Sequence, residues 1–253
     1  MSRRLTSQPD TFDPTAFDRL GRAEPGHFWF EERRRLIVWA VGQHFPHTRS
    51  FCDVGCGTGF VLAGLAKQYP TLKLTGTDFY PQALAHTAQR LPDVKLHQGD
   101  ILAGDFSETF DVVGCFDVLE HIPDDQGALG RLAARVRPGG GLILTVPQHR
   151  ALWSVADEIG HHCRRYERAE LVEKVCAAGF EVLAVTSFVS LLLPFLWLNR
   201  KRASVSADAF AELKIGRLPN ALFAGVMTIE RKLIQAGYSF PAGGSLLLLA
   251  QRT

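Results

Sequence analysis

The sequence lacks the cysteine and histidine spacings from which metal sites and disulfide frameworks are usually predicted. Its five cysteines are odd in number and scattered, and no Cys-x-x-Cys or His-x-x-x-His spacing occurs. Scattered cysteines of this kind are typical of reduced thiols in a cytosolic protein. We therefore expect no metal site.

Net charge and targeting signals are scarce as well. Lys and Arg number 28 and Asp and Glu 26, a formal net charge of +2, so no global field attracts nucleic acid. The basic N-terminus is not followed by the apolar core of a signal peptide. Internal repeats and low-complexity segments are absent too. These absences predict a cytoplasmic protein that does not bind nucleic acid.

Apolar, β-prone runs alternate with helical stretches along the chain. With 253 residues, 46% of them hydrophobic, the chain can bury one sizeable core. Strands are expected at residues 51–54, 72–77, 94–97, 110–115, 142–146, 180–185 and 244–250. Helices are expected from residue 60 and at residues 81–90, 124–136, 168–178 and 219–236, the one at 124–136 being ended by Pro138 and the Gly139–Gly141 run. Such alternation is typical of a parallel sheet covered on both faces, a doubly wound α/β fold with its ligand at the carboxyl ends of the strands.

One stretch stands at the first strand's end: Phe51-Cys52-Asp53-Val54-Gly55-Cys56-Gly57-Thr58-Gly59-Phe60. Alternate glycines let the chain turn tightly into a helix and let a ligand lie against bare main chain. The dinucleotide fingerprint, G-x-G-x-x-G, faces a pyrophosphate. Here the spacing is G-x-G-x-G, and Asp53 precedes it, a carboxylate that suits a cationic ligand better. The turn alone leaves NAD, FAD or another nucleoside-bearing cofactor open.

Acidic residues follow the next three expected strands. Asp78 ends the second strand, Asp100 follows the third, and Asp117 and Glu120 follow the fourth. Because the carboxyl ends of parallel strands share one edge, these acids should converge on one cleft. Each alone could be a solvated loop carboxylate, but together they favour a cofactor site. Asp78 could accept both ribose hydroxyls.

From about residue 51 to residue 146, and more weakly to the end, the sequence resembles the class I S-adenosylmethionine-dependent methyltransferases. The resemblance rests, in order, on Asp53–Gly59, Asp78, Gly99-Asp100, Asp117-Val118-Leu119-Glu120-His121-Ile122 and Leu132–Val146 with its Arg137-Pro138-Gly139-Gly140. It implies a Rossmann-like sheet of seven strands, mostly parallel with the last strand antiparallel. The chain departs from the family by placing about sixty residues between its last two strands, a long excursion for a compact domain that predicts a helical insertion.

Carried over to this sequence, the resemblance implies a site for S-adenosyl-L-methionine. Asp53 and the glycine turn would hold the methionine part, Asp78 the ribose hydroxyls, and Asp100 with Ile101 the adenine amine. The implied cofactor-binding residues are Asp53, Gly55, Cys56, Gly57, Thr58, Gly59, Asp78, Phe79 beside the adenine, Asp100, Ile101, and Asp117 near the methionine end.

An aromatic and basic segment precedes the turn. Apolar positions between Trp29 and Val41 fit a helix with one buried stripe and a basic opposite face. In one interpretation this helix packs on the sheet and its arginines are solvated. In the other it covers the ligand, and Arg33 binds a carboxylate through its bidentate fork, which makes Arg33 a further cofactor-binding candidate. Residues 1–24 show little periodicity and are expected to form a loose arm.

A polar loop after the fifth strand carries the candidate catalytic residues. Because a methyl on a sulfonium is already activated, in-line positioning supplies most of the acceleration, and a base is needed only if the acceptor must lose a proton. His149 or His162 could be that base, with Asp157 orienting an imidazole. Most histidines outside a proven site have no catalytic role, so a structural role for either stays open. His121 has a rival role beside the cofactor.

The end of this loop resembles a G-H-x-R-R-Y-like stretch in a bacterial subgroup of these enzymes, of methyltransferase type 11 or 12. The doubled histidine leaves open whether His161 or His162 matches it. One hypothesis is that Arg164 or Arg165, with Tyr166, binds an anionic or polar acceptor. The alternative is a structural loop in which Arg165 and Tyr166 tie down the following helix.

Residues 188–198 are largely apolar and are followed by the basic run at 199–202. The apolar run is broken by Pro194 and is too short to span a bilayer. It could form a buried lid over the active site. It could instead contact a membrane surface, with Trp197 and the basic run at the headgroup level, which would fit a lipid-linked acceptor.

We expect one methyltransferase domain over residues 1–253. It divides into an arm and cap helix (1–48), a cofactor-binding core (49–187), a lid or insertion (188–244) and the last strand (245–253).

The predicted activity is methyl transfer from S-adenosyl-L-methionine to a small-molecule or lipid-linked acceptor, mainly to oxygen. A non-catalytic binding module of the same fold is one alternative. A nicotinamide-dependent oxidoreductase is another, disfavoured by the turn spacing and by Asp53. No N-P-P-Y-like motif for a flipped base follows the fourth strand, which argues against a nucleic-acid substrate.

Overall fold

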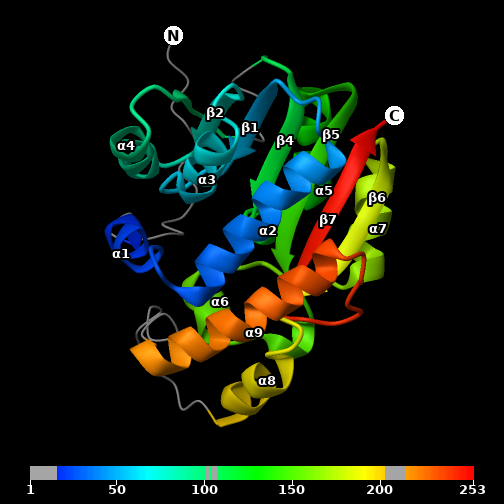
Figure 1. The fold of residues 1–253 in the computed structure, drawn as a ribbon. Helices are drawn as coiled ribbons and strands as arrows, with labels where there is room; N and C mark the ends of the chain where they lie inside the picture. Colours follow the sequence, from blue (N-terminus) through cyan, green and yellow to red (C-terminus); the bar gives the residue numbers. More distant parts are fainter. Residues whose placement is uncertain (1–15, 101–102, 104–106, 203–214) are drawn as a thin grey trace.

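A seven-stranded sheet runs through the computed structural model, which describes residues 16–100, 103, 107–202 and 215–253, but not the side chains of residues 199–202. The strands are β1 (Ser50–Val54), β2 (Lys73–Asp78), β3 (Lys95–Gln98), β4 (Phe110–Phe116), β5 (Val136–Pro147), β6 (Phe180–Phe188) and β7 (Ser245–Arg252). They follow the order β3-β2-β1-β4-β5-β7-β6 (Figure 1). β7 pairs antiparallel with β5 and β6, and the other pairs are parallel. The expected doubly wound sheet with an antiparallel last strand is confirmed.

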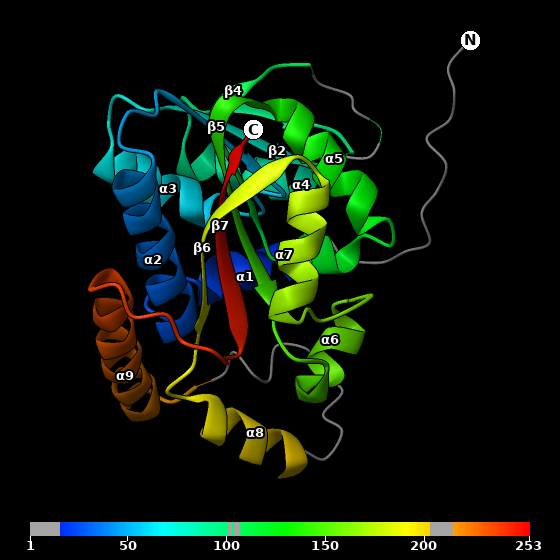
Figure 2. The same cartoon turned by 90° about the vertical axis from the view of Figure 1, so that its right-hand side faces the viewer.

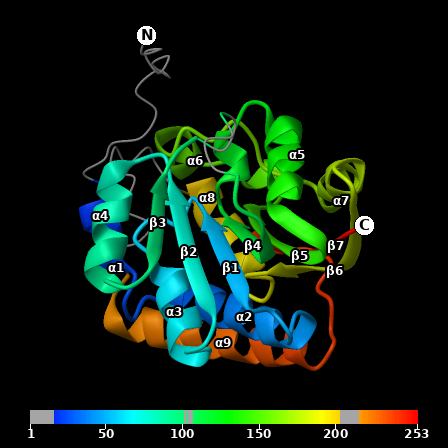
Figure 3. The same ribbon diagram turned by 90° about the horizontal axis from the view of Figure 1, so that it is seen from above.

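Helices cover both faces of the sheet. They are α1 (Ala16–Ala23), α2 (Phe28–His44), α3 (Phe60–Gln68), α4 (Pro81–Arg90), α5 (Asp125–Arg135), α6 (Val155–Ile159), α7 (Arg168–Ala177), α8 (Leu193–Arg202) and α9 (Arg217–Gln235), with short 3-10 turns η1 (Leu119–His121) and η2 (Arg150–Leu152). Figures 2 and 3 show α2, α3 and α9 on one face and α5 and α7 on the other. β4 and β5 point toward the side where α6 and α8 lie, so the carboxyl ends of the parallel strands open there.

The last strand shows how the two faces are filled. Side chains of a strand alternate between faces, and β7 is apolar at every position from Leu246 to Ala250. Leu247 and Leu249 pack in the core under α2 and α9, whereas Leu246 and Leu248 pack in the core under α5 and α7. Fully burying one leucine stabilises a fold by roughly 1.5–3 kcal/mol, so this strand joins the two layers firmly.

The N-terminal arm differs from the expectation. Residues 16–23 form α1, and Glu24 just after it lies 2.9 Å from the Arg90 guanidinium. A helix this short gains its stability from tertiary contacts, which explains why sequence periodicity did not reveal it. Residues 1–15 of the arm and 203–214 of the insertion lie outside the described part of the chain.

The glycine run after α5 also differs from the expectation. The helix ends at Arg135, and Pro138 and the glycine run lie inside β5. Phe110 pairs with Val136 and Val112 with Gly141, so the glycine run bulges out of the ladder between these two pairs. The run lengthens the strand at its start, where sequence reasoning placed a break.

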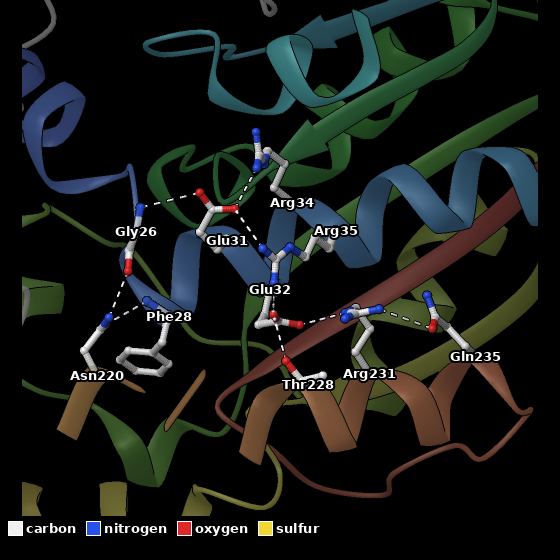
Figure 4. A network of polar contacts seen from close by, with 10 residues as sticks. All are labelled: Gly26, Phe28, Glu31, Glu32, Arg34, Arg35, Asn220, Thr228, Arg231 and Gln235. Carbon is white, nitrogen blue, oxygen red and sulfur yellow. Dashed lines mark hydrogen bonds and ion pairs between the residues drawn. The ribbon is translucent and has the colours of Figure 1, made fainter. Parts of the chain in front are cut away.

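Helix α9, from the long insertion, is fixed to α2 by a buried polar network (Figure 4). Glu32 of α2 is only 2% exposed and accepts hydrogen bonds from Arg231 at 2.7 Å and Thr228 at 3.1 Å. Asn220 accepts from the Phe28 backbone N–H at 2.9 Å. A buried carboxylate is tolerable only with such partners. This part of the insertion therefore belongs to the layer that covers the sheet, and it fixes the position of α2.

Of the helices that the structure describes, none is both long enough and apolar enough to cross a bilayer.

The Glu32 network predicts a marked loss of stability when its charge is removed. Glu32→Gln leaves Arg231 without its counter-charge and removes the nearer of the two that Arg35 has, so we expect the free energy of unfolding to fall by about 3–5 kcal/mol. Glu31→Gln is the matched control, because Glu31 pairs with Arg34 at a more exposed place and should cost about 1 kcal/mol or less. Urea unfolding measures both, and equal losses would contradict the role of Glu32.

Candidate active site

The turn after β1 is shaped by three glycines in the left-handed region, with φ of 75° at Gly55, 56° at Gly57 and 74° at Gly59. A Cβ on Gly55 would lie 2.4 Å from the Val118 side chain, and one on Gly59 would lie 2.8 Å from Thr87. A Cβ on Gly57 would meet nothing within 4 Å. Two of the glycines are thus required by packing, and the third leaves open space over bare main chain.

The two residues between the glycines, Cys56 and Thr58, are in contact with neighbouring parts of the protein. The Thr58 hydroxyl is buried and donates to the Glu24 carboxylate at 2.6 Å. The same hydroxyl accepts a hydrogen bond from Arg90 at 3.0 Å. Cys56 is buried, and its Sγ lies 3.8 Å from the Thr87 hydroxyl. The side chains of Cys56 and Thr58 are thus occupied by contacts within the protein, so at these two predicted cofactor positions only the main chain is available to a ligand. Sequence reasoning missed Glu24, which no local pattern connects to the turn.

Two carboxylates are buried beside the turn. Asp53 is 2% exposed, and its Oδ1 has no hydrogen-bond partner among the described residues. Burial raises the pKa of Asp53 to about 7, with Arg33 opposing the rise and Asp78 adding to it. Asp78 accepts the backbone N–H groups of Gly57 and Tyr80, both at 2.9 Å, and burial raises its pKa as well. The end of β1 thus holds an unsatisfied acceptor that a cationic donor would suit.

Arg33 reaches this acidic region from α2. Its Nη2 lies 2.7 Å from Asp117 Oδ2, and its side chain is 11% exposed. Asp117 adopts a left-handed φ of 56° and accepts from the Thr145 hydroxyl at 3.1 Å. Arg33 is therefore not solvated, and its ion-pair partner is a carboxylate of the protein, held through a single nitrogen.

The residues expected around adenine follow β2 and β3. Phe79 is 45% exposed, with its ring 5.2 Å from that of Tyr80, so one aromatic surface is open at the end of β2. Gln98 donates to the Phe79 carbonyl at 3.3 Å. The Asp100 carbonyl accepts from Ala103 at 3.1 Å. Ile101 lies outside the described residues.

Among the catalytic candidates, the structure brings Asp157 and His162 together. Asp157 is fully buried, and its Oδ1 lies 2.8 Å from His162 Nδ1. Arg165 binds both oxygens of Asp157, at 2.8 and 2.9 Å. Burial opposes ionisation, but the hydrogen bonds from His162 and Arg165 hold the pKa of Asp157 well below its usual range.

The other loop histidines lie apart from this pair. His149 Nδ1 lies 3.1 Å from the half-exposed carboxylate of Glu167. His161 is exposed and has a left-handed φ of 53°. Of the doubled histidines, it is therefore His162 that an ionised carboxylate orients.

The two residues that flank Arg165 are bound to a carboxylate that sequence reasoning missed. Asp125, at the start of α5, lies 2.6 Å from Arg164 Nη1, 2.8 Å from the Tyr166 hydroxyl and 2.8 Å from Lys174 Nζ. Tyr166 is fully buried. These contacts fit the structural alternative for the loop, in which its end is tied to α5 and α7.

Two further ionisable groups lie on η1, after β4. Glu120 is 1% exposed, its Oε2 has no hydrogen-bond partner within the described part of the chain, and burial raises its pKa well above the usual range. The rings of His121 and His162 are 4.6 Å apart and nearly perpendicular. Burial, and then the charge of His162, lower the pKa of His121 to about 4, so its imidazole is neutral near pH 7.

A doubly wound sheet with a glycine turn after β1 and acids at the ends of β1 and β2 and after β4 is typical of α/β proteins that bind a nucleoside-bearing cofactor at the carboxyl edge of the sheet. Residues 22–185 match the family described as a methyltransferase domain. The chain belongs to this family, which confirms the resemblance to the class I S-adenosylmethionine-dependent methyltransferases.

Individual relatives share parts of the chain. A probable S-adenosylmethionine-dependent methyltransferase of Mycolicibacterium smegmatis is 30% identical over 186 residues, 69% of each chain. The trans-aconitate 2-methyltransferase of Deinococcus radiodurans is 38% identical over 113 residues, so the chain spans only 43% of that relative. An N-methyltransferase of Bradyrhizobium japonicum in complex with S-adenosyl-L-homocysteine has a TM-score of 0.59 at 15% identity, covering 97% of this chain and 99% of that one. At that identity the likeness shows the fold.

The open space over Gly57 predicts that Gly57→Ala weakens cofactor binding. The added methyl enters the space where a ligand would meet the main chain, so we expect the dissociation constant for S-adenosyl-L-homocysteine to rise at least tenfold, a cost of about 1.4 kcal/mol or more. Calorimetric titration measures this.

Gly139→Ala is the matched control. Gly139 also has a positive φ, 74°, and open space around it, but it lies in the β5 bulge, so both variants carry similar backbone strain of about 1–2 kcal/mol. Equal affinities in the two variants would show that no ligand lies over Gly57.

Proposed function

We propose that the protein transfers the methyl group of S-adenosyl-L-methionine to an oxygen of a small-molecule or lipid-linked acceptor. The observation that carries the proposal is the bare main chain at Gly57 beside two buried carboxylates, one of which has an unsatisfied oxygen. An ammonium group would satisfy Asp53 Oδ1, and a pyrophosphate would be repelled by it. The spacing of the turn and the charge of Asp53 thus disfavour the nicotinamide alternative.

The residues present fit this cofactor, which supplies the activated methyl group when bound. Asp53 and the main chain of the turn would hold its methionine part, and Arg33 is placed to meet a carboxylate. Both Asp78 oxygens already accept a backbone N–H, but each has a second lone pair, so they can still accept ribose hydroxyls. Asp117 would lie near the methionine end, and Asp100 and Ile101 near the adenine.

The exposed aromatic ring of Phe79 supports its proposed place against the adenine. A purine packed on such a ring gains stacking energy and removes apolar surface from water.

For the acceptor's proton we propose His162, positioned by Asp157, in preference to His149. Asp157 is ionised and holds Nδ1 of His162, which leaves Nε2 as the nitrogen able to take a proton. His149 is bound to Glu167, whose side chain is 49% exposed, so the group that orients it lies near solvent. Arg165 acts indirectly in this proposal, because it shares the carboxylate of Asp157.

The acceptor is proposed to be hydrophobic or lipid-linked because of the surface around α8. Leu191, Phe195 and Trp197 are each 44–48% exposed. Figure 2 shows α8 on the side toward which the parallel strands point. Such a surface supports peripheral contact of residues 188–202 with a lipid face. The five cysteines are all unpaired, which supports a reducing compartment such as the cytoplasm.

Labelled methyl transfer tests the proposal. The protein and S-adenosyl-L-methionine with a labelled methyl group are added to a fractionated cell lysate, and the aqueous, lipid, protein and nucleic-acid fractions are counted. We expect label in the small-molecule or lipid fraction, with loss of signal in Gly57→Ala.

Two results would overturn the proposal. One is label confined to protein or nucleic acid. The other is saturable binding of NAD without binding of S-adenosyl-L-homocysteine. Identification of the labelled product by mass spectrometry then shows whether oxygen, nitrogen or carbon carries the methyl group.

A further inference from the structure

Two imidazoles and a carboxylate meet where η1 touches the loop after α6. Glu120, His121 and His162 each offer one ligand atom, and these atoms all lie within 4.8 Å of one another. Glu120 and His121 are adjacent in sequence, but His162 lies far along the chain. The sequence therefore contains no metal-ligand spacing from which these three residues could be predicted to form a site.

One backbone hydrogen bond joins the two segments, and a second one holds His162 against α6. The N–H of Cys163 donates to the Glu120 carbonyl at 2.6 Å, and the N–H of His162 donates to the Asp157 carbonyl at 2.8 Å. The position of the three side chains thus depends on main-chain hydrogen bonds, and rigid placement of this kind is what a ligand site requires.

The imidazole of His162 is oriented by a second group. Its Nδ1 is bound to the carboxylate of Asp157, and the ring of His121 packs nearly perpendicular to that of His162. Metal-binding histidines nearly always have one ring nitrogen fixed by a carboxylate or a backbone carbonyl in this way, which leaves the other nitrogen for the metal. Asp157 is a positioning residue in this arrangement.

The carboxylate of Glu120 supplies an independent observation. Its residue is 1% exposed, and Oε2 has no hydrogen-bond partner among the residues described. Burying such an oxygen without a partner is costly, and a bound cation would remove that cost. We propose that Glu120, His121 and His162 bind a divalent transition-metal ion such as Zn²⁺.

The donor set decides the class of ion. Two nitrogen ligands and one oxygen ligand suit Zn²⁺ and its first-row neighbours, whereas Mg²⁺ and Ca²⁺ prefer oxygen ligands throughout. Three protein ligands leave a coordination position open, as in catalytic zinc sites. If the proposed function holds, an acceptor hydroxyl bound at that position would release its proton to solvent water more easily, and His162, whose Nε2 would then be a metal ligand, would not take that proton itself.

Metal binding is tested on tag-free protein without acceptor or cofactor. After dialysis against a chelator, calorimetric titration with Zn²⁺ should show one site per chain. Titration with Co²⁺ should give visible d–d absorption without a thiolate-to-cobalt charge-transfer band. Absence of stoichiometric binding would overturn the inference, and so would a thiolate band, because it would assign the ion to Cys163 instead.

Variants locate the site. Glu120→Gln and His162→Ala should each lower Zn²⁺ affinity at least tenfold, and Asp157→Asn about 10–100-fold through its effect on His162. His161→Asn is the control, since asparagine tolerates the left-handed φ of this exposed neighbour, and it should bind Zn²⁺ like the unchanged protein. Unchanged affinity in Glu120→Gln, or equal loss in His161→Asn, would overturn the assignment.

Binding of S-adenosyl-L-homocysteine, measured on the same samples, separates this inference from the proposed function. Glu120→Gln should keep that binding, which also reports that the variant is folded. Protein that binds S-adenosyl-L-homocysteine but no Zn²⁺ contradicts only the metal site. Protein that binds Zn²⁺ but no S-adenosyl-L-homocysteine contradicts only the methyltransferase proposal.

Discussion

Negative charge is crowded into the carboxyl edge of the sheet, and the protein must compensate for it. Asp53, Asp78 and Glu120 are all buried, and burial raises the pKa of each. Like charges in a region of low dielectric repel strongly, so such a cluster is stable only with protons, cations or hydrogen-bond donors among its members. Arg33 supplies one such cation: it forms an ion pair with Asp117, and its charge opposes the rise in the pKa of Asp53 and of Glu120.

The surrounding architecture serves to hold that arginine in place. Arg33 is carried by α2, and α2 is fixed by the Glu32–Arg231 pair to a helix from the long insertion. The insertion therefore helps to fix the position of Arg33 even though α9 lies on the outer layer. Two carboxylate oxygens of this edge, Asp53 Oδ1 and Glu120 Oε2, have no hydrogen-bond partner within the described parts of the chain, and there we propose that positive charge binds: the cofactor at the first and a metal ion at the second.

The sequence predicted what depends on local pattern. Apolar runs placed the strands, Pro81 began its helix as expected, and alternate glycines with Asp53 marked the turn. Contacts between distant segments were not predictable. The role of Asp125 depends on its contacts with Arg164, Tyr166 and Lys174. The sequence left both His149 and His162 open as the partner of Asp157, and only the folded loop shows that it is His162. The β5 bulge was missed because a proline and three glycines also signal a break, and only pairing with β4 shows that the strand continues through them.

The count of protons released when S-adenosyl-L-methionine binds tests the central claim most directly. With a pKa of about 7, Asp53 is about half protonated at pH 7, and a cation bound beside it would favour the ionised form. Calorimetry at pH 7 in buffers of different ionisation enthalpy should therefore show a release of up to about half a proton per site, and Asp53→Asn should abolish that release. Binding that takes up protons, or that releases as many in Asp53→Asn as in the unchanged protein, would contradict the account.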